Sequence, residues 1–493
     1  MIEYIVAIFA LWVIILYAVR KWGEKYGLDI SGPLLLWKTE KGKRLIDRIA
    51  RKKGWKVYGN IAILITVVAM VATSYLIIMN VIISFQISPE SAPSPRLMLG
   101  IPGINPIIPI GYGIIALAIA IIVHEFSHGI LARFERIKVK ALGLVFLIVP
   151  VGAFVEPDEE QLLKVKRAKR ARVFAAGPTA NIVLAVICLL LLSFVFAPSI
   201  SPKEEGAILT QDFGGIEKWS VIAGVNGNSI SSASEIKEIL KEIDAGEIYE
   251  IEAKTSGNKI AVNIARGIYV AKIVKNSPAE GVIEKGSIIY MINGVDIVNQ
   301  STFLDFMDST VAGELVNISL YLNGSFYSKV ITLADRHDFV KGEKEMGKGF
   351  LGIQAYGIED AVIDESYFSQ IYNPLKGKFL PYLALPFLGL SPPPHEIMNL
   401  YTPSPLFWSF YNLLYWIFWL NFAVGTFNAL PAIPLDGGYI LKDGINYLFS
   451  LIPKTRKRAD KISTMVSSVI SILLFISVFA IILIPRLREI ISF

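Results

Sequence analysis

Two histidines and a glutamate stand close together in one apolar stretch of this 493-residue chain. They form the motif His124-Glu125-Phe126-Ser127-His128. On a helix, positions i and i+4 lie on one face, so both imidazoles could bind one zinc ion. Glu125 could then act as a general base on a water molecule at the metal. A pair of packing histidines is the alternative, but three ionisable groups in one apolar helix require a compensating role.

A catalytic zinc usually has three protein ligands and a water molecule. His337 and His395 are poor candidates for the third ligand, because both are expected outside the membrane. Asp436 is the better candidate; it lies in segment 431–438, which reads PAIPLDGG and breaks an apolar helix near the expected depth of His128. As an alternative, Asp436 could cap the helix that follows it.

The composition indicates an integral membrane protein. Hydrophobic residues make up 53% of the chain and charged residues 18%, whereas soluble proteins average about 25% charged residues. The single cysteine, Cys188, excludes an intrachain disulfide and a Cys-rich zinc site. The net charge of +6 comes from basic residues beside apolar runs, which indicates cytoplasmic loops and no nucleic-acid partner.

Six apolar runs are candidates for membrane-spanning helices. They cover residues 5–19, 57–85, 107–134, 173–196, 406–430 and 462–484. The first reads as a retained span, because no basic segment precedes it as in a signal peptide. Basic residues concentrate in segments 20–56, 133–172 and 439–461. The positive-inside rule then places both termini and residues 198–405 outside the cytoplasm, and His128 near the cytoplasmic side.

An internal repeat lies within residues 203–335. Val-Asn-Gly at 225–227 recurs as Ile-Asn-Gly at 292–294, and Ala-Gly-Glu at 245–247 recurs at 312–314, both 67 residues later. A helix-like stretch follows each Asn-Gly, and two strand-like stretches around a glycine turn follow each Ala-Gly-Glu. Two equal offsets predict a duplicated α+β domain.

Both copies resemble PDZ domains, most clearly over residues 269–294 of the second copy. PDZ domains bind an extended peptide, such as a protein C-terminus, as an added strand at an open sheet edge. The alternative is a rigid spacer that filters access by bulk alone. Residues 336–405 are expected to form an extracytoplasmic loop.

The motifs together resemble the site-2 protease family of intramembrane zinc metalloproteases. They are HEFSH at 124–128, GPTAN at 177–181, the paired PDZ domains, and NALPAIPLDGG at 428–438. The resemblance implies one zinc ion per chain. It implies His124, His128 and Asp436 as ligands, Glu125 as the group that activates water, and Asn428 as a donor to the oxyanion. Asn181 is expected to be structural; the alternative is that it helps to position the substrate.

The expected fold class is a membrane all-α polytopic bundle of about six transmembrane helices, with extracytoplasmic α+β tandem PDZ domains. The resemblance adds a re-entrant β-type loop over residues 141–160 beside the zinc. The expected divisions are 1–106 (two spans and a basic cytoplasmic loop), 107–200 (first half of the catalytic core), 201–266 and 267–335 (PDZ domains), 336–405 (loop), and 406–493 (second half of the core and last span).

The implied function is zinc-dependent cleavage within transmembrane segments of membrane proteins. It includes regulated intramembrane proteolysis, in which another protease makes a first cut. The implied partners are transmembrane substrates, peptide C-termini at the PDZ domains, and the lipid bilayer of a multi-pass cell-membrane protein. The main alternative is an inactive PDZ scaffold, which would not need Glu125 in lipid. A metal transporter would need a second cluster of metal ligands near the midplane of the membrane. A membrane protease whose third zinc ligand is a glutamate would need a second helix with an ExxxD/E-type motif.

Overall fold

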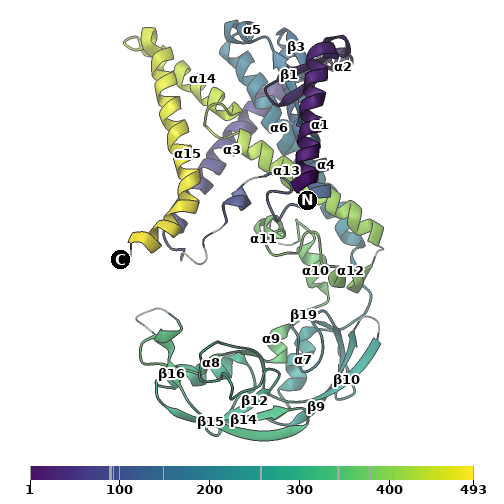
Figure 1. Cartoon of the computed structure of the whole chain (residues 1–493), viewed down its shortest axis with the longest axis vertical. Coiled ribbons are helices and arrows are strands. Elements are labelled where there is room, and N and C mark those ends of the chain that lie inside the picture. The colour runs from purple at the N-terminus through teal and green to yellow at the C-terminus, as the bar shows by residue number, and fades with distance from the viewer. Residues whose placement is uncertain are drawn as a thin grey trace. The chain divides into compact units, whose positions relative to one another are not determined.

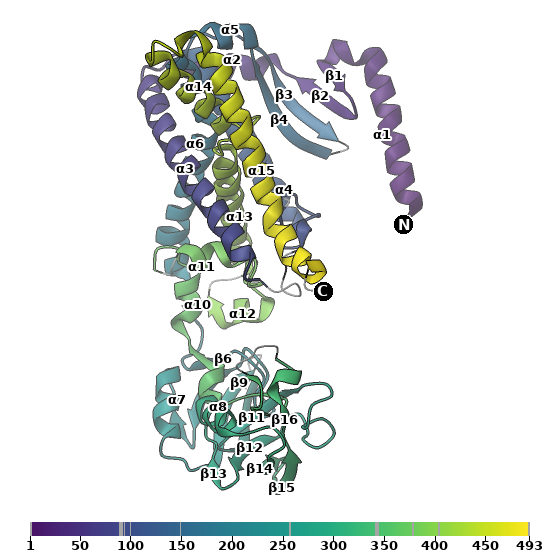
Figure 2. The same ribbon diagram turned by 90° about the vertical axis from the view of Figure 1, so that its left-hand side faces the viewer.

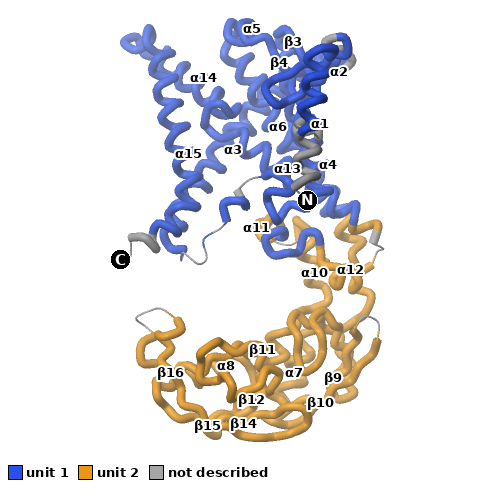
Figure 3. The backbone as a smooth tube through the Cα atoms, in the orientation of Figure 1, with its two compact units in different colours: residues 1–194, 385–392, 409–493 blue, residues 195–384, 393–408 orange. Residues whose placement is uncertain are grey.

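The computed structural model describes residues 2–87, 92, 94–98, 100–147, 149–255, 258–340, 345–376, 379–402 and 405–491. The chain divides into two compact units (Figure 3). Unit 1 holds residues 1–194, 385–392 and 409–493, and unit 2 holds residues 195–384 and 393–408. Each unit is therefore assembled from segments that are far apart in the sequence.

Unit 1 is mainly helical (Figure 1). Its helices are α1 (Ile2–Trp22), α2 (Glu40–Ala50), α3 (Trp55–Ser84), α4 (Ile110–Phe134), α5 (Glu159–Lys164), α6 (Arg167–Leu191), α13 (Pro405–Asn428, which begins in unit 2), α14 (Asp436–Leu451) and α15 (Ala459–Ile491). Helix α6 is central, because α3, α4 and α14 all pack against it. HEFSH lies on α4 and GPTAN on α6, so the packing of these two helices brings both motifs together.

Four helical stretches among the described residues are long and apolar enough to cross a membrane. They cover residues 55–84, 110–134, 167–199 and 456–487. Helices α1 and α13 stand at the other two expected positions without being among these four. Helix α13 carries Asn412, Asn421 and several tryptophans and tyrosines, which lower its hydropathy. The count of six spans therefore stays a prediction.

A four-stranded antiparallel sheet belongs to unit 1, in the order β1-β2-β3-β4. Its strands are β1 (Leu28–Ser31), β2 (Leu34–Lys38), β3 (Val139–Leu147) and β4 (Val149–Pro157). The segment expected as a β-type loop is thus the hairpin β3–β4. Its re-entry into the membrane stays a prediction, and Ile148 lies outside the described residues.

The hairpin β1–β2 corrects the expectation that residues 20–56 are only a basic loop. Strand β2 pairs with β3, for example Leu36 with Val145, so this segment extends the sheet. In Figure 2 the sheet lies between α1 and the other helices of unit 1. The turn residues Gly32-Pro33 could have indicated this hairpin. The strands were not predicted because they are short and many basic residues flank them.

Unit 2 contains two six-stranded sheets with the same topology. The first has the order β10-β9-β7-β6-β19 with β8 on β7, and the second has β15-β14-β12-β11-β18 with β13 on β12. The strands of the first are β6 (Ala207–Leu209), β7 (Val221–Val225), β8 (Asn228–Ser229), β9 (Ile248–Thr255), β10 (Asn258–Ala265) and β19 (Val362–Asp364); those of the second are β11 (Ile268–Ile273), β12 (Ile288–Ile292), β13 (Val295–Asp296), β14 (Leu315–Leu322), β15 (Ser325–Thr332) and β18 (Ile353–Tyr356). Helices α7 (Ala233–Leu240) and α8 (Gln300–Ser309) follow the two Asn-Gly turns. The two copies of the repeat thus correspond to two sheets with the same strand order.

The last strand of each copy comes from beyond residue 335, where only a loop was expected. Strand β18 pairs with β11 of the second copy, and β19 pairs with β6 of the first. Residues 353–364 therefore complete both sheets. These strands are only four and three residues long, so the sequence pattern of a strand is weak there. The other elements of unit 2 are β5 (Ser201–Pro202), β16 (Ala334–Asp335), β17 (Gly349–Phe350), α9 (Ile358–Ala361), α10 (Ser366–Ile371), α11 (Phe379–Ala384), α12 (His395–Leu400) and β20 (Tyr401–Thr402).

The hydrophobic core of the first copy continues into the second copy. Tyr269 and Tyr356 of the second copy pack on Phe213 of the first, with ring centroids 5.5 and 6.4 Å apart. Beside them, Arg266 donates to both carboxylate oxygens of Glu359 at 2.7 and 2.8 Å. Arg266 is only 4% exposed. This ion pair connects Arg266, which lies between the two copies, to segment 353–364, which supplies the last strand of each sheet.

Replacing Arg266 with leucine is expected to destabilise unit 2 by about 3–5 kcal/mol, because it leaves the Glu359 carboxylate buried without its partner. Hydrogen–deuterium exchange of the strand amides in the full-length chain measures the effect. The double variant Arg266→Leu/Glu359→Leu should recover most of the protection. Lys241→Leu, which breaks an exposed ion pair with Glu238, should change it little. Equal protection in Arg266→Leu and wild type would contradict the prediction.

Candidate metal centre

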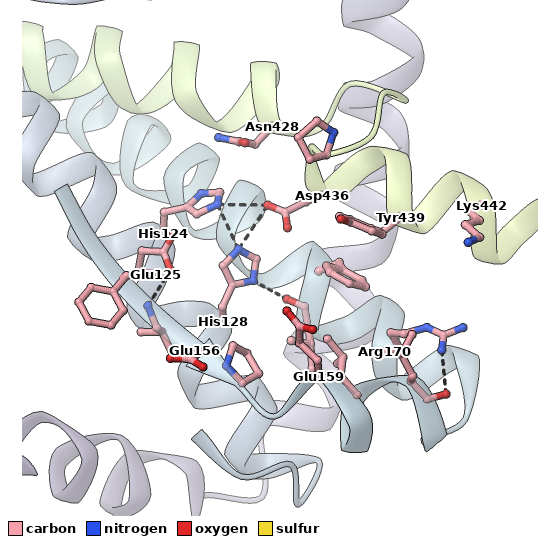
Figure 4. A pocket seen from close by; sticks show the side chains of 18 of the residues that line it. His124, Glu125, His128, Glu156, Glu159, Arg170, Asn428, Asp436, Tyr439 and Lys442 are labelled. Carbon is pink, nitrogen blue, oxygen red and sulfur yellow. Dashed lines mark hydrogen bonds and ion pairs between the residues drawn. The ribbon is translucent and has the colours of Figure 1, made fainter. Parts of the chain in front are cut away.

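Three side chains from two separate helices converge in unit 1 (Figure 4). His124 and His128 come from α4, and Asp436 is the first residue of α14. Asp436 Oδ2 lies 3.1 Å from His124 Nε2 and 3.3 Å from His128 Nε2, and the two Nε2 atoms are 3.1 Å apart. The donor atoms of a tetrahedral zinc site, bound at about 2.0 Å, lie about 3.3 Å from one another. The spacing therefore fits one zinc ion.

The start of α14 places Asp436 at this point. Helix α13 ends at Asn428, and the start of α14 lies close to Ala429 and Leu430, which follow α13 directly. A Cβ atom on Gly437 would lie 1.9 Å from the carbonyl oxygen of Ala429, so this close approach requires glycine. The N-cap residue is Leu435, and Asp436 directs Oδ2 at the histidines. The alternative that Asp436 is the cap of α14 is therefore wrong.

Both imidazole rings are fixed through their second nitrogen. His128 Nδ1 lies 2.7 Å from the carbonyl oxygen of Val173, and His124 Nδ1 lies 2.8 Å from Asn181 Oδ1. A carbonyl oxygen can only accept, so each Nδ1 carries a proton in these bonds. Both Nε2 atoms then keep a lone pair, which is the form a metal ligand needs.

The space for the metal depends on Gly177 of α6. A Cβ atom there would lie 2.4 Å from His128 Nε2 and 2.6 Å from His124 Nε2. The glycine of the GPTAN motif therefore leaves open the volume that faces both ligand atoms. Together with the donor set of two histidines and an aspartate, this open volume shows that the residues present fit a zinc ion.

Glu125 lies beside this group and contacts the sheet. Its Oε2 atom accepts a hydrogen bond of 3.0 Å from the backbone N–H of Val155. Val155 is on β4, which is an edge strand of the sheet. The amide thus points away from β3 and toward the carboxylate, so the hairpin orients the side chain that the sequence predicted as a base.

The centre opens into a cavity of about 1220 Å³. Asn428 lines it, and its Nδ2 atom donates to the carbonyl oxygen of Val424 at 3.0 Å. An amide has two N–H donors, and this bond uses one of them. Residues of β4 and of the hairpin β1–β2, including Ile30 and Leu36, form further parts of the wall. Sequence reasoning missed this contribution of the first hairpin.

The five predicted site residues come together in the structure. His124, Glu125, His128, Asn428 and Asp436 all line this one cavity. His337 and His395 belong to unit 2 and are not members of the metal-binding group.

Sequence reasoning did not assign Asn181 to the histidine and did not single out Asn421. The sequence signal for such a contact was an asparagine within an apolar helix, because its amide needs a polar partner there.

Comparison with known proteins agrees with this geometry. The family model described as Peptidase family M50 matches residues 112–474, a range that includes α4, α6, α13 and α14. This chain belongs to Peptidase family M50. The expected resemblance to site-2 proteases is confirmed, and the family and the apolar helices support a membrane metalloprotease. Zinc is the metal that the family implies.

The relatives of this M50 chain are matched over part of their length. "Uncharacterized protein MJ0971" of Methanocaldococcus jannaschii is 34% identical over 251 residues, which are 48% of this chain and 64% of that protein. "Membrane-bound transcription factor site-2 protease homolog" of Arabidopsis thaliana is 23% identical over 211 residues, 40% of each chain. A solved PDZ domain of the SdrC-like protein from Listeria innocua is 25% identical and covers 18% of this chain and 92% of its own, with a TM-score of 0.16. The match to the first relative thus spans just under two thirds of its length.

Proposed function

We propose that this M50 protein is a zinc-dependent intramembrane endopeptidase that cleaves within the transmembrane segments of other membrane proteins. The observation that carries the proposal is the convergence of His124, His128 and Asp436 from α4 and α14, with Glu125 beside them. A bound zinc ion would supply Lewis-acid activation of water and of a carbonyl oxygen. His124 Nε2, His128 Nε2 and Asp436 Oδ2 would hold it.

Glu125 is the proton carrier of the proposed reaction. Its carboxylate takes a proton from the attacking water and returns it to the amine that leaves. The hydrogen bond from Val155 N–H holds one carboxylate oxygen and leaves the other for the proton transfer. Asn428 lines the same cavity. Its second Nδ2–H donates a hydrogen bond to the carbonyl oxygen of the scissile peptide bond as that oxygen becomes negative.

Strand β4 is the proposed docking edge for the substrate. A transmembrane helix has its backbone groups paired internally, so a scissile peptide bond becomes accessible only after local unwinding. An unwound segment can add as a further strand to the edge of β4 that β3 leaves unpaired, through backbone groups other than the Val155 N–H that already donates to Glu125. Substrates should therefore carry helix-weakening residues near the cleaved bond.

Unit 2 and the membrane arrangement extend the proposal. The duplicated sheets support two PDZ domains, which either bind peptide C-termini or restrict access by size. The charge distribution supports a metal centre within the membrane near its cytoplasmic side and an extracytoplasmic unit 2. In that arrangement the enzyme acts in regulated intramembrane proteolysis, including on substrates shortened by another protease.

Metal removal tests the proposal directly. Purified full-length protein in detergent is mixed with a transmembrane model peptide that carries a glycine or asparagine near its centre. Cleavage is expected in buffer, is expected to stop after treatment with a zinc chelator, and should return on addition of zinc. A matched all-leucine peptide should be cut much more slowly. Mass spectrometry identifies the cleaved bond.

Two results would contradict the proposal. Cleavage that continues unchanged without zinc would exclude the metal centre as the active site. Stoichiometric zinc without cleavage of any transmembrane peptide, together with peptide binding by unit 2, would favour the PDZ scaffold.

A further inference from the structure

A buried chain of side-chain hydrogen bonds ends on His124. Asn421 of α13 donates from Nδ2 to the carbonyl oxygen of Ile417 at 2.8 Å. Its Oδ1 atom accepts from Asn181 Nδ2 at 2.9 Å, and Asn181 Oδ1 faces His124 Nδ1 at 2.8 Å. Both asparagines have no exposed surface. The chain therefore connects a backbone group of α13 to the imidazole on α4 through α6.

The direction of every bond in this chain is fixed by its partners. Asn181 Nδ2 also donates to the carbonyl oxygen of Ala120 at 2.9 Å. If the Asn181 amide were reversed, its oxygen would face two acceptors, Ala120 O and Asn421 Oδ1. If Asn421 were reversed, its oxygen would face Ile417 O. Because such contacts between acceptors are unfavourable in a buried site, the network presents only an acceptor to His124.

We propose that Asn181, supported by Asn421, is a positioning residue of the metal centre. Its Oδ1 atom keeps the His124 proton on Nδ1 and so keeps the Nε2 lone pair directed at the metal. The inference rests on the proposed zinc site and assigns to GPTAN a role in that site. It replaces the expectation that Asn181 serves only helix packing.

The two histidines are held in different ways. His128 is fixed by the backbone carbonyl oxygen of Val173, which no side-chain substitution removes. The orientation of the His124 ring depends on the Asn181 side chain, so a substitution at position 181 can change it. Side chains that accept from the second nitrogen of a metal-binding histidine typically contribute about 10–100-fold to metal affinity.

The experiment measures zinc affinity in the full-length chain in detergent, by competition with a chromophoric chelator. Asn181→Leu removes the acceptor at similar volume, and we expect zinc to bind about 10–100-fold more weakly. Asn181→Asp keeps an acceptor opposite Nδ1, although its second oxygen then faces the Ala120 carbonyl oxygen and Asn421 Oδ1, and it should therefore bind zinc more tightly than Asn181→Leu does. Asn421→Leu should give a smaller loss in the same direction. Asn412→Leu, which replaces another buried asparagine of α13, should leave the affinity unchanged.

A second measurement separates positioning from packing. The visible absorption spectrum of the cobalt-substituted protein should change in Asn181→Leu and be retained in Asn412→Leu. Thermal unfolding of the metal-free proteins reports the packing cost. Asn181→Leu should lose stability because it leaves the Ala120 carbonyl oxygen and Asn421 Oδ1 without their donor, whereas Asn412→Leu should lose less, because Asn412 Oδ1 has no hydrogen-bond partner among the described residues. Asn181→Asp loses the same donors as Asn181→Leu, so the difference between these two variants in zinc affinity and in the cobalt spectrum reports positioning.

The results that would overturn the inference are specific. Unchanged zinc affinity and an unchanged cobalt spectrum in Asn181→Leu would overturn it while leaving the proposed zinc site intact. Equal losses in Asn181→Asp and Asn181→Leu would also overturn it, because the acceptor would then be irrelevant. A wild-type chain that binds no zinc would overturn the proposed function as well.

Discussion

Replacing Gly177 with alanine is expected to remove zinc from the protein without unfolding it. The added methyl group would lie 2.4 Å from His128 Nε2 and 2.6 Å from His124 Nε2. The rings cannot simply move aside, because Asn181 and the Val173 carbonyl hold their Nδ1 atoms. Mutations of residues that only hydrogen-bond to the metal ligands lower metal affinity by up to about 100-fold. A methyl group placed between the ligand atoms themselves should lower zinc affinity by at least that much.

The same substitution should not weaken helix α6 itself, because alanine is favoured over glycine in a helix interior by about 1 kcal/mol. Zinc content by mass spectrometry and thermal unfolding of the metal-free protein give the two readouts. Gly444→Ala on α14 is the matched control, since a Cβ atom there meets nothing within 4 Å; it should keep full zinc content. Gly177→Ala with wild-type zinc affinity would show that the metal does not lie between these histidines.

Replacing Glu125 with glutamine is expected to stop cleavage while zinc stays bound. Glutamine has nearly the same size, and its carbonyl oxygen can still accept from Val155 N–H. It cannot take a proton from water, and loss of a general base typically lowers the rate by about 10²–10⁴-fold. The rate of cleavage of a transmembrane model peptide, measured beside the zinc content, checks both parts.

Asp436→Ala is the contrasting variant in that experiment. It removes a proposed ligand, so zinc content and cleavage should fall together, whereas Glu125→Gln should separate them. A Glu125→Gln protein that cuts within a few-fold of the wild-type rate would refute the assignment of Glu125 as the base.

The sequence predicted those parts of the fold that correspond to long apolar runs or to the internal repeat. The apolar runs correspond to α1, α3, α4, α6, α13 and α15, within a few residues at most ends. The equal offsets of the repeat predicted two domains with the same strand order. The hairpin β1–β2 and the closing strands β18 and β19 were not predicted. Strands of three to five residues gain their stability from pairing with distant segments, and local sequence does not report that pairing.

The sequence by itself determined the chemistry of the centre: two histidines one helical turn apart, a carboxylate between them, and an aspartate in a helix-breaking segment. Residue type and spacing along one helix are local properties, so they can be read directly. Only the tertiary structure decided that Asp436 reaches both histidines, that Gly177 leaves the volume between them open, and that Asn181 and Asn421 fix His124. Those relations depend on how α4, α6, α13 and α14 pack, and packing joins residues up to 312 positions apart.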